Sequence, residues 1–240
     1  MGTTLRGLLP FSLLFLLPML GQAQQRMAAD VTVRQVYQGK SMRVEKQLFY
    51  TAGGNLVVHY THPQEYYMLT NTLGEMQVYQ PQAGEVMQMT DAEFSSQSET
   101  FALFMRPDYA DLGLTRHGFT LKDVRRDGND VVKTYRPSAI DDRNIGRVVV
   151  VCRDGKPIYS AFYDLSDRLL RKVYYSRYTA LPSFSFPTSV TQISYDTKGD
   201  SVIKKEEYRN IRTSGFGSEA LFDYKVPATA RRVSPQQPRK

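Results

Sequence analysis

Residues 57–81, VVHYTHPQEYYMLTNTLGEMQVYQP, read as consecutive β-strands that are rich in Tyr, Val and Met and hold only two carboxylates. In the second strand, Tyr66 and Met68 belong to one alternating set of side chains. Tyr67 and Leu69 belong to the other set. A strand with one face in water normally alternates apolar with polar side chains. The pattern therefore predicts a sheet in which both faces are covered, by other parts of the chain or by a ligand.

The chain after residue 30 repeats this strand pattern at short spacing, without a linker or a change of composition up to residue 227. Period-two segments alternate with turns rich in Gly, Asn, Asp and Pro, the clearest of which lie at residues 52–55, 81–84, 127–129, 153–156 and 198–200. Short strands joined by tight turns are typical of antiparallel all-β domains. We therefore expect a single, mainly β domain with about eleven strands.

One segment, residues 91–105, breaks the period of two. Five of its side chains lie at helical spacing and form one mainly apolar stripe: Phe94, Gln97, Phe101, Phe104 and Met105. Asp91 is suited to cap the first turn, and Pro107 follows the last one. The sequence predicts one helix here, inserted between the strands.

The two ends of the chain carry a different pattern. Residues 1–23 combine a positive start, an apolar stretch over residues 7–20 and small residues at the end, which is typical of a secretory signal peptide cleaved before Gln24. The stretch is short for a transmembrane helix, so a retained membrane anchor is the weaker alternative. We expect a soluble protein exported to the periplasm, with one domain over residues 24–233 and a disordered basic tail over residues 234–240.

Cys152 is the only cysteine, so no intramolecular disulfide can form. It ends the apolar run at residues 147–152, where a buried structural thiol is expected rather than a nucleophile. A domain of this length has a core large enough to fold without disulfides, which fits a bacterial periplasmic protein.

The charges and the motifs argue against several function classes. The formal net charge is +7, but the basic residues are scattered. Arg171, Val173 and Tyr175 share one face of an expected strand, which gives one basic residue on that face rather than the basic stripe of a nucleic-acid site. His59 and His62 point to opposite faces of an extended chain, which disfavours a metal site. We therefore expect no enzymatic activity, no cofactor, no metal and no nucleic-acid partner.

Three stretches together resemble the LolA-like outer-membrane lipoprotein carriers. The first, FYTAGGNLVVHYTHPQEYYMLTNTLGEMQVYQPQAGEVMQM at residues 49–89, has that family's order of strands, Gly turns and a Pro break, followed by a helical insertion. The second, RVVVVCRDGKPIYSAFYD at residues 147–164, is a strand, an Asp-Gly turn and a strand. The third, LFDYKVPATARRV at residues 221–233, is similar to the family's final strand.

The resemblance implies an unclosed β-barrel, in which a strongly curved antiparallel sheet carries a helical lid over its concave face. Between sheet and lid lies a hydrophobic cavity for acyl chains. It further implies a monomeric periplasmic chaperone that binds lipoprotein acyl chains or a similar lipid and moves them toward the outer membrane. Its partners would be a lipidated protein or lipid and a delivery partner at the inner or outer membrane.

Two other functions stay open at this point. One is a non-transport envelope interaction or stress-sensing module with the same fold. The other is an unrecognised hydrolase, although the sequence displays no convergent Ser, His and carboxylate. The chain also departs from the family pattern: the best-known carriers place an Arg that contacts the lid in the turn before the apolar-aromatic strand, and residues 51–55 hold no basic residue.

On this reading, the expected cavity lies between the strands of the opening stretch and the predicted helix. One alternating set, with Leu56, Val58 and Tyr60, is favoured to face the cavity, because the polar His59 belongs to the other set. The residues expected to line the cavity are Leu56, Val58, Tyr60, Tyr67, Leu69, Val78, Phe94, Phe101, Phe104 and Met105.

Overall fold

The computed structural model describes residues 26–51, 53–91, 94–96, 99–106, 109–139, 144–182, 184–197, 199–213 and 220–234. The predicted signal peptide and residues 235–240 of the predicted basic tail lie outside the described residues. No helix in the described ranges is long and apolar enough to cross a membrane.

A single 14-stranded sheet contains all the strands of the described chain, in the order β14-β6-β5-β4-β3-β2-β1-β13-β12-β11-β10-β9-β8-β7. Neighbouring strands are antiparallel, except that β14 runs parallel to β6. The strands are β1 (Arg26–Tyr37), β2 (Lys40–Thr51), β3 (Leu56–His62), β4 (Tyr66–Thr70), β5 (Glu75–Gln80), β6 (Glu85–Thr90), β7 (Phe119–Asp127), β8 (Asp130–Pro137), β9 (Ile145–Arg153), β10 (Lys156–Asp164), β11 (Leu169–Ala180), β12 (Ser185–Tyr195), β13 (Ser201–Thr213) and β14 (Arg231–Val233).

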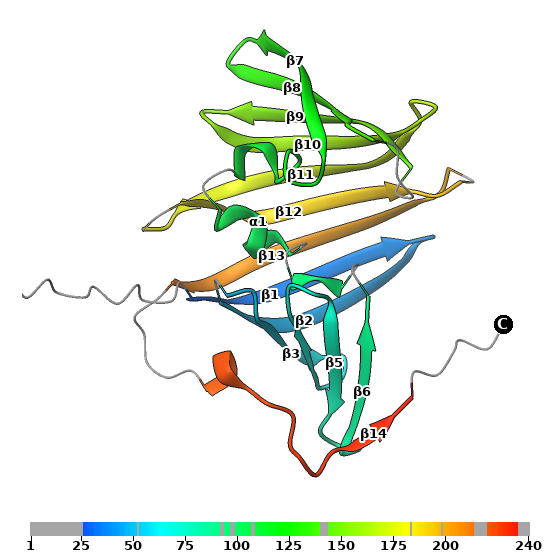
Figure 1. The fold of residues 1–240 in the computed structure, drawn as a ribbon, viewed down its shortest axis with the longest axis vertical. Coiled ribbons are helices and arrows are strands. Elements are labelled where there is room, and N and C mark those ends of the chain that lie inside the picture. The colour runs from blue at the N-terminus through cyan, green and yellow to red at the C-terminus, as the bar shows by residue number, and fades with distance from the viewer. Residues whose placement is uncertain are drawn as a thin grey trace, which may run out of the picture.

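The sheet has two ends, β14 and β7, and does not close on itself. The expected mainly β, unclosed fold is therefore confirmed, whereas the expected number of strands, about eleven, was too low. Figure 1 shows β7 to β13 stacked in one layer, while β5 and β6 are turned steeply against them at the other end. The final strand begins later in the chain than the resemblance over residues 221–233 suggests. The 3-10 helix η4 (Ala220–Asp223) comes first, and the three residues of β14, which follow Pro227, pair with β6.

The predicted helix over residues 91–105 is much shorter in the structure. α1 (Thr100–Phe104) has 5 residues, and it lies in front of β12 and β13 in Figure 1. The hydroxyl of Thr70 donates a hydrogen bond to the Phe94 carbonyl at 2.6 Å, and the Ser96 amide donates to the Asn71 carbonyl at 3.0 Å. These backbone groups bond to the β4–β5 turn, so they do not extend the helix toward its N-terminal side.

Each face of the sheet carries its own apolar cluster. The inner face, which packs against α1, holds Leu56 and Val58 in the main core. The outer face holds Val57 and, partly buried, Leu69, packed against the residues of η4 and Tyr224. Both faces of the opening stretch are therefore covered, as its two partly apolar sets of side chains predict.

Cys152 confirms a second expectation from the sequence. It is a free cysteine that is buried in the main core of the inner face. Its thiol lies 3.5 Å from the Ala110 carbonyl oxygen, and burial raises the pKa of this thiol. A buried thiol with a raised pKa is a poor nucleophile, because only the thiolate reacts.

The turn between β2 and β3 requires glycine at residue 54. Gly54 has φ of +87°, and a Cβ there would lie 2.1 Å from Cγ2 of Thr72. Gly84 is also left-handed, with φ of +61°, but a Cβ there meets no atom within 4 Å. A substitution at Gly84 therefore tests the left-handed backbone alone, whereas a substitution at Gly54 tests the same backbone together with the contact to Thr72.

We predict that Gly84→Ala lowers the free energy of unfolding by about 1–2 kcal/mol, the cost of a left-handed backbone for a residue with a Cβ. Gly54→Ala should cost a further ~1–3 kcal/mol, because the added methyl overlaps Thr72. Urea denaturation of both variants measures the difference. Equal losses in the two variants would show that the contact with Thr72 is not tight.

Candidate functional site

Aromatic packing holds α1 against the inner face. The ring of Phe101 lies 5.0 Å from that of Phe186 and 5.4 Å from that of Tyr208, measured between centroids. The ring of Phe104 lies 5.8 Å from that of Phe186. Phe101 is 1% exposed and Phe104 and Phe186 are 0% exposed, so these rings form a sealed core and not the wall of a cavity.

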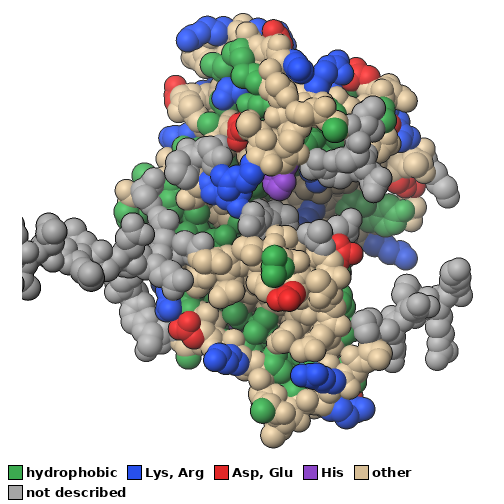
Figure 2. All heavy atoms as spheres, in the orientation of Figure 1, with side chains coloured by type: hydrophobic (Ala, Val, Ile, Leu, Met, Phe, Trp, Pro, Cys, Tyr) green, Lys and Arg blue, Asp and Glu red, His purple; other side chains and the backbone are tan. Residues whose placement is uncertain are grey.

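A pocket of about 430 Å³ lies beside this aromatic core, between α1, the segment that follows it and strands β9 to β13. Apolar side chains form more than half of its lining: Leu103, Leu112, Leu114, Phe119, Ile145, Phe162, Val173, Tyr175 and Val190. Glu99, Thr100, His117, Arg171, Gln192, Lys204 and Glu206 complete the lining. Figure 2 shows this side of the molecule, where hydrophobic side chains reach the surface both above and below its middle.

A buried carboxylate network forms part of the pocket floor. Glu206 is 8% exposed, and its carboxylate lies 2.9 Å from Nζ of Lys204 and accepts a hydrogen bond from the Tyr208 hydroxyl at 2.7 Å. Burial raises the pKa of Glu206, but the charges of Lys204 and Lys46 and the hydrogen bonds from Lys204 and Tyr208 together outweigh it, so this pKa lies below its usual value. Burial raises the pKa of Tyr208 well above its usual value, and the charges of Glu206 and Glu99 raise it further. The Tyr208 ring also contacts Phe101, so the network on β13 lies directly beside α1.

A second set of hydrogen bonds fastens the segment before α1 to the sheet. Ser96 is 0% exposed, and its hydroxyl donates to the Gly54 carbonyl at 2.5 Å. The Ser95 hydroxyl donates to the Thr72 carbonyl at 3.0 Å. The turn that lacks the Arg expected from the resemblance thus still contacts this segment, through a backbone carbonyl instead of a basic side chain.

Six of the ten residues expected to line a cavity belong to the main core of the inner face. Leu56, Val58, Phe101 and Phe104 are buried in it, and Tyr60 and Met105 pack against it partly buried. Val78 pairs with Met68, which also packs against this core, so Val78 lies on the same face. These side chains share a face, but none of them lines the 430 Å³ pocket.

The other three expected residues lie elsewhere. Tyr67 stacks on Tyr224 with ring centroids 4.4 Å apart, and Leu69 packs in the outer-face cluster. Both are on the outer face because they alternate with Met68, which lies on the inner face. Phe94 is 37% exposed. Tyr67 and Phe94 line neither hollow of the described chain, whereas Leu69 lies beside Leu56 in the lining of a separate hollow of about 610 Å³.

The sequence did not predict that most of the strand residues around the pocket would line a ligand site. They come from β9 to β13, whereas the sequence directed attention to β3, β4 and the predicted helix. A signal was present, because Arg171, Val173 and Tyr175 share one face of their strand. All three line the pocket.

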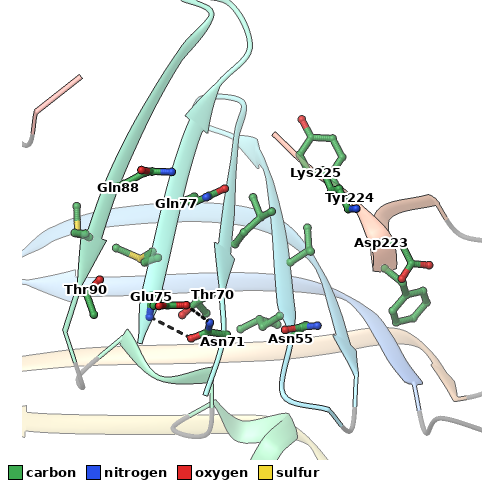
Figure 3. A pocket seen from close by; sticks show the side chains of 16 residues that line it. Asn55, Thr70, Asn71, Glu75, Gln77, Gln88, Thr90, Asp223, Tyr224 and Lys225 are labelled. Carbon is green, nitrogen blue, oxygen red and sulfur yellow. Dashed lines mark hydrogen bonds between the residues drawn. The ribbon is translucent and has the colours of Figure 1, made fainter. Parts of the chain in front are cut away.

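The outer face carries a second hollow of about 610 Å³, between β3 to β6 and the segment after η4. Figure 3 shows Gln77 and Gln88 on neighbouring strands, with Tyr224 and Lys225 on the far side of the hollow. The amide of Asn71 donates to the Glu75 carboxylate at 2.6 Å, as one of the dashed lines in Figure 3 marks. The labelled side chains are mostly polar, but Leu56, Val57, Leu69, Met76, Met89 and Phe222 also line this groove, so its lining is mixed.

Comparisons with known proteins assign the fold. No protein-family model and no curated protein matches the chain. Among solved structures, it is similar to a LolA superfamily protein from Nitrosomonas europaea, with 13% identity, a TM-score of 0.57, and coverage of 82% of this chain and 90% of that one. It is also similar to a DUF1329 family protein from Desulfovibrio piger, with 16% identity, a TM-score of 0.57, and coverage of 84% and 90%.

A third similar structure is described as an outer membrane lipoprotein-sorting protein domain from Vibrio parahaemolyticus. The identity is 13%, the TM-score is 0.56, and the match covers 82% of this chain and 89% of that one. The chain has the LolA-like fold, as the strand order of the sequence suggested. At these identities the likeness concerns the fold alone.

The Ser96 hydrogen bond generates a prediction about α1. Ser96→Ala leaves the Gly54 carbonyl buried without this donor, which should cost about 1–3 kcal/mol. We expect hydrogen exchange of the α1 amides to become about tenfold faster or more, because local opening requires less free energy.

Hydrogen exchange read by mass spectrometry over residues 99–106 measures the effect. Ser41→Ala, at an exposed serine of β2, is the matched control and should change stability by less than about 0.5 kcal/mol. Equal exchange rates in the two variants would mean that this hydrogen bond does not hold α1 in place.

Proposed function

We propose that this chain is a periplasmic carrier that binds lipoprotein acyl chains or a similar lipid and moves them toward the outer membrane. The observation that carries the proposal is the apolar pocket beneath α1 in a LolA-like fold. The third similar structure, described as a lipoprotein-sorting domain, supports the same class of cargo. An exported carrier of this kind agrees with the signal peptide predicted from the sequence.

The size and the chemistry of the pocket suit an acyl chain. Its volume of about 430 Å³ lies toward the lower end of the ~300–1,000 Å³ range of small-molecule sites. Burial of an acyl chain contributes about 0.8 kcal/mol per methylene. A chain of ordinary length therefore gains enough free energy for tight binding from its tail alone.

In this proposal α1 acts as a lid that moves when larger cargo enters. It holds the inner face mainly through Phe101 and Phe104, and exposing each of these side chains costs about 1.5–3 kcal/mol. Several acyl methylenes offset that cost. Displacement of the two rings would uncover Leu56, Val58 and Tyr60, which would extend the pocket along β3 and give these residues the lining role expected from the sequence.

One observation favours a second candidate function, an envelope interaction or sensing module. The outer-face groove of about 610 Å³ is larger than the pocket beneath α1, and its lining combines apolar side chains with Asn55, Gln77, Gln88 and Lys225. Amide and charged side chains suit a polypeptide better than a hydrocarbon tail. A protein partner bound in this groove without any lipid beneath α1 would support the second function over the first.

Native mass spectrometry tests the carrier function directly. We predict that protein purified from the periplasm without detergent carries an added mass that matches an acyl lipid or a lipidated protein. Organic extraction should release the acyl component and return the chain to its own mass. Protein that is free of lipid, and that also takes up none from added triacylated lipopeptide, would contradict the proposal.

A space-filling variant tests the place of binding. Val173→Phe puts a larger side chain into the pocket beneath α1, where it displaces part of the acyl chain. At about 0.8 kcal/mol per methylene, the loss of about two methylenes weakens binding roughly tenfold. Tyr174→Phe, at the next residue and on the opposite face of β11, should leave affinity unchanged. Equal affinity in both variants would place the lipid elsewhere.

A further inference from the structure

Arg171 is a charged side chain set among the apolar walls of the pocket beneath α1. It comes from β11, where it alternates onto the inner face with Val173 and Tyr175. Its guanidinium carbon lies 3.9 Å from the centroid of the Phe162 ring, which is directly across from it on β10. The side chain is partly buried, and burial lowers the pKa of its guanidinium. An arginine nevertheless remains protonated in proteins, so a positive charge is retained at the pocket wall.

No carboxylate of the described residues forms an ion pair with Arg171. The other cation of the lining is different, because Lys204 is paired with Glu206 at 2.9 Å. A guanidinium stacked on an aromatic ring keeps its N–H donors free at the edge of the plane. Charges that are taken out of water are normally paired or hydrogen-bonded, so this one is suited to an anion that a ligand supplies.

The two carboxylates of the pocket lie near other groups. The Glu206 carboxylate lies 2.9 Å from Nζ of Lys204 and accepts the Tyr208 hydroxyl hydrogen bond. Glu99 raises the pKa of Tyr208 and Tyr60 through its charge. Glu206 is paired with Lys204, and none of the described carboxylates pairs with Arg171. The Arg171 end of the pocket is therefore positive, although the lining as a whole carries both signs.

From this arrangement we infer that the pocket binds a single-chain amphiphile whose anionic head pairs with Arg171 and whose acyl tail lies along the apolar walls. The inference rests on the proposed lipid-binding function and adds to it the charge and the number of chains of the ligand. A carboxylate or a phosphate monoester supplies the same chemistry, because both accept paired N–H bonds from a guanidinium. A volume of about 430 Å³, near the lower end of the range for ligand sites, favours one chain over three in this conformation.

The test compares three ligands that differ only in the head: hexadecanoate, hexadecyl phosphate and hexadecanol. Binding is measured by calorimetry, below the concentration at which each ligand aggregates, on the full mature chain after removal of co-purified lipid. The wild type should bind both anions more tightly than the alcohol, and the tighter of the two identifies the preferred head. Arg171→Met keeps the length of the side chain and should weaken anion binding about tenfold or more, without weakening binding of hexadecanol.

Two further variants separate charge from folding. Arg171→Lys retains a cation and should recover part of the anion affinity. Lys172→Met removes a cation from the next residue, on the opposite face of β11, and should change nothing. Tight binding of hexadecanol with no preference for the anions, or anion affinity that survives in a folded Arg171→Met chain, overturns the inference but leaves lipid binding in place. Failure of all three ligands in a chain that still takes up triacylated lipopeptide overturns this inference alone, whereas failure of the lipopeptide as well overturns the proposed function.

Discussion

The contact of Phe101 and Phe104 with Phe186 and Tyr208 closes the inner face of the sheet, and the other features of that face depend on it. A sheet of this width cannot leave a large apolar face in water, and α1, with 5 residues, is too short to cover it all. The rings seal the middle of the face. The pocket beneath α1 is the part that they leave uncovered, so the same contact provides stability and sets the limit of the space for a ligand.

Polar groups make this contact specific. Tyr208 belongs to the aromatic core through its ring and to the Glu206 network through its hydroxyl. Ser95 and Ser96 add hydrogen bonds from the segment just before α1 to the sheet. An apolar contact alone would let a short helix slide over the sheet, whereas buried hydrogen bonds fix its position and penalise other arrangements. Movement of α1 is thus expected to be all-or-none, because several bonds must break together.

Much of the fold could be predicted from the sequence because the signals are local. The two apolar sets of residues 57–81 indicate that both faces are covered, and the turn residues mark where strands end. The length of α1 could not be predicted in this way, because it depends on Thr70 and Asn71, which are distant in sequence from the backbone groups that they engage. The position of the pocket depends on the twist of the sheet, which brings β9 to β13 opposite Leu103. The sequence placed Arg171 on one strand face with Val173 and Tyr175, but its contact with Phe162 depends on the pairing of β10 with β11.

The two ends of the sheet differ, and the difference limits how copies of this chain could associate. At one end β14 offers only three residues, and it occupies the edge of β6 that would otherwise be open. At the other end β7 is nine residues long and largely exposed. Growth of a sheet from molecule to molecule requires two usable edges on each of them. Strand addition through β7 alone would join two chains about a twofold axis and end there, because an open fibre would need a second usable edge on each chain.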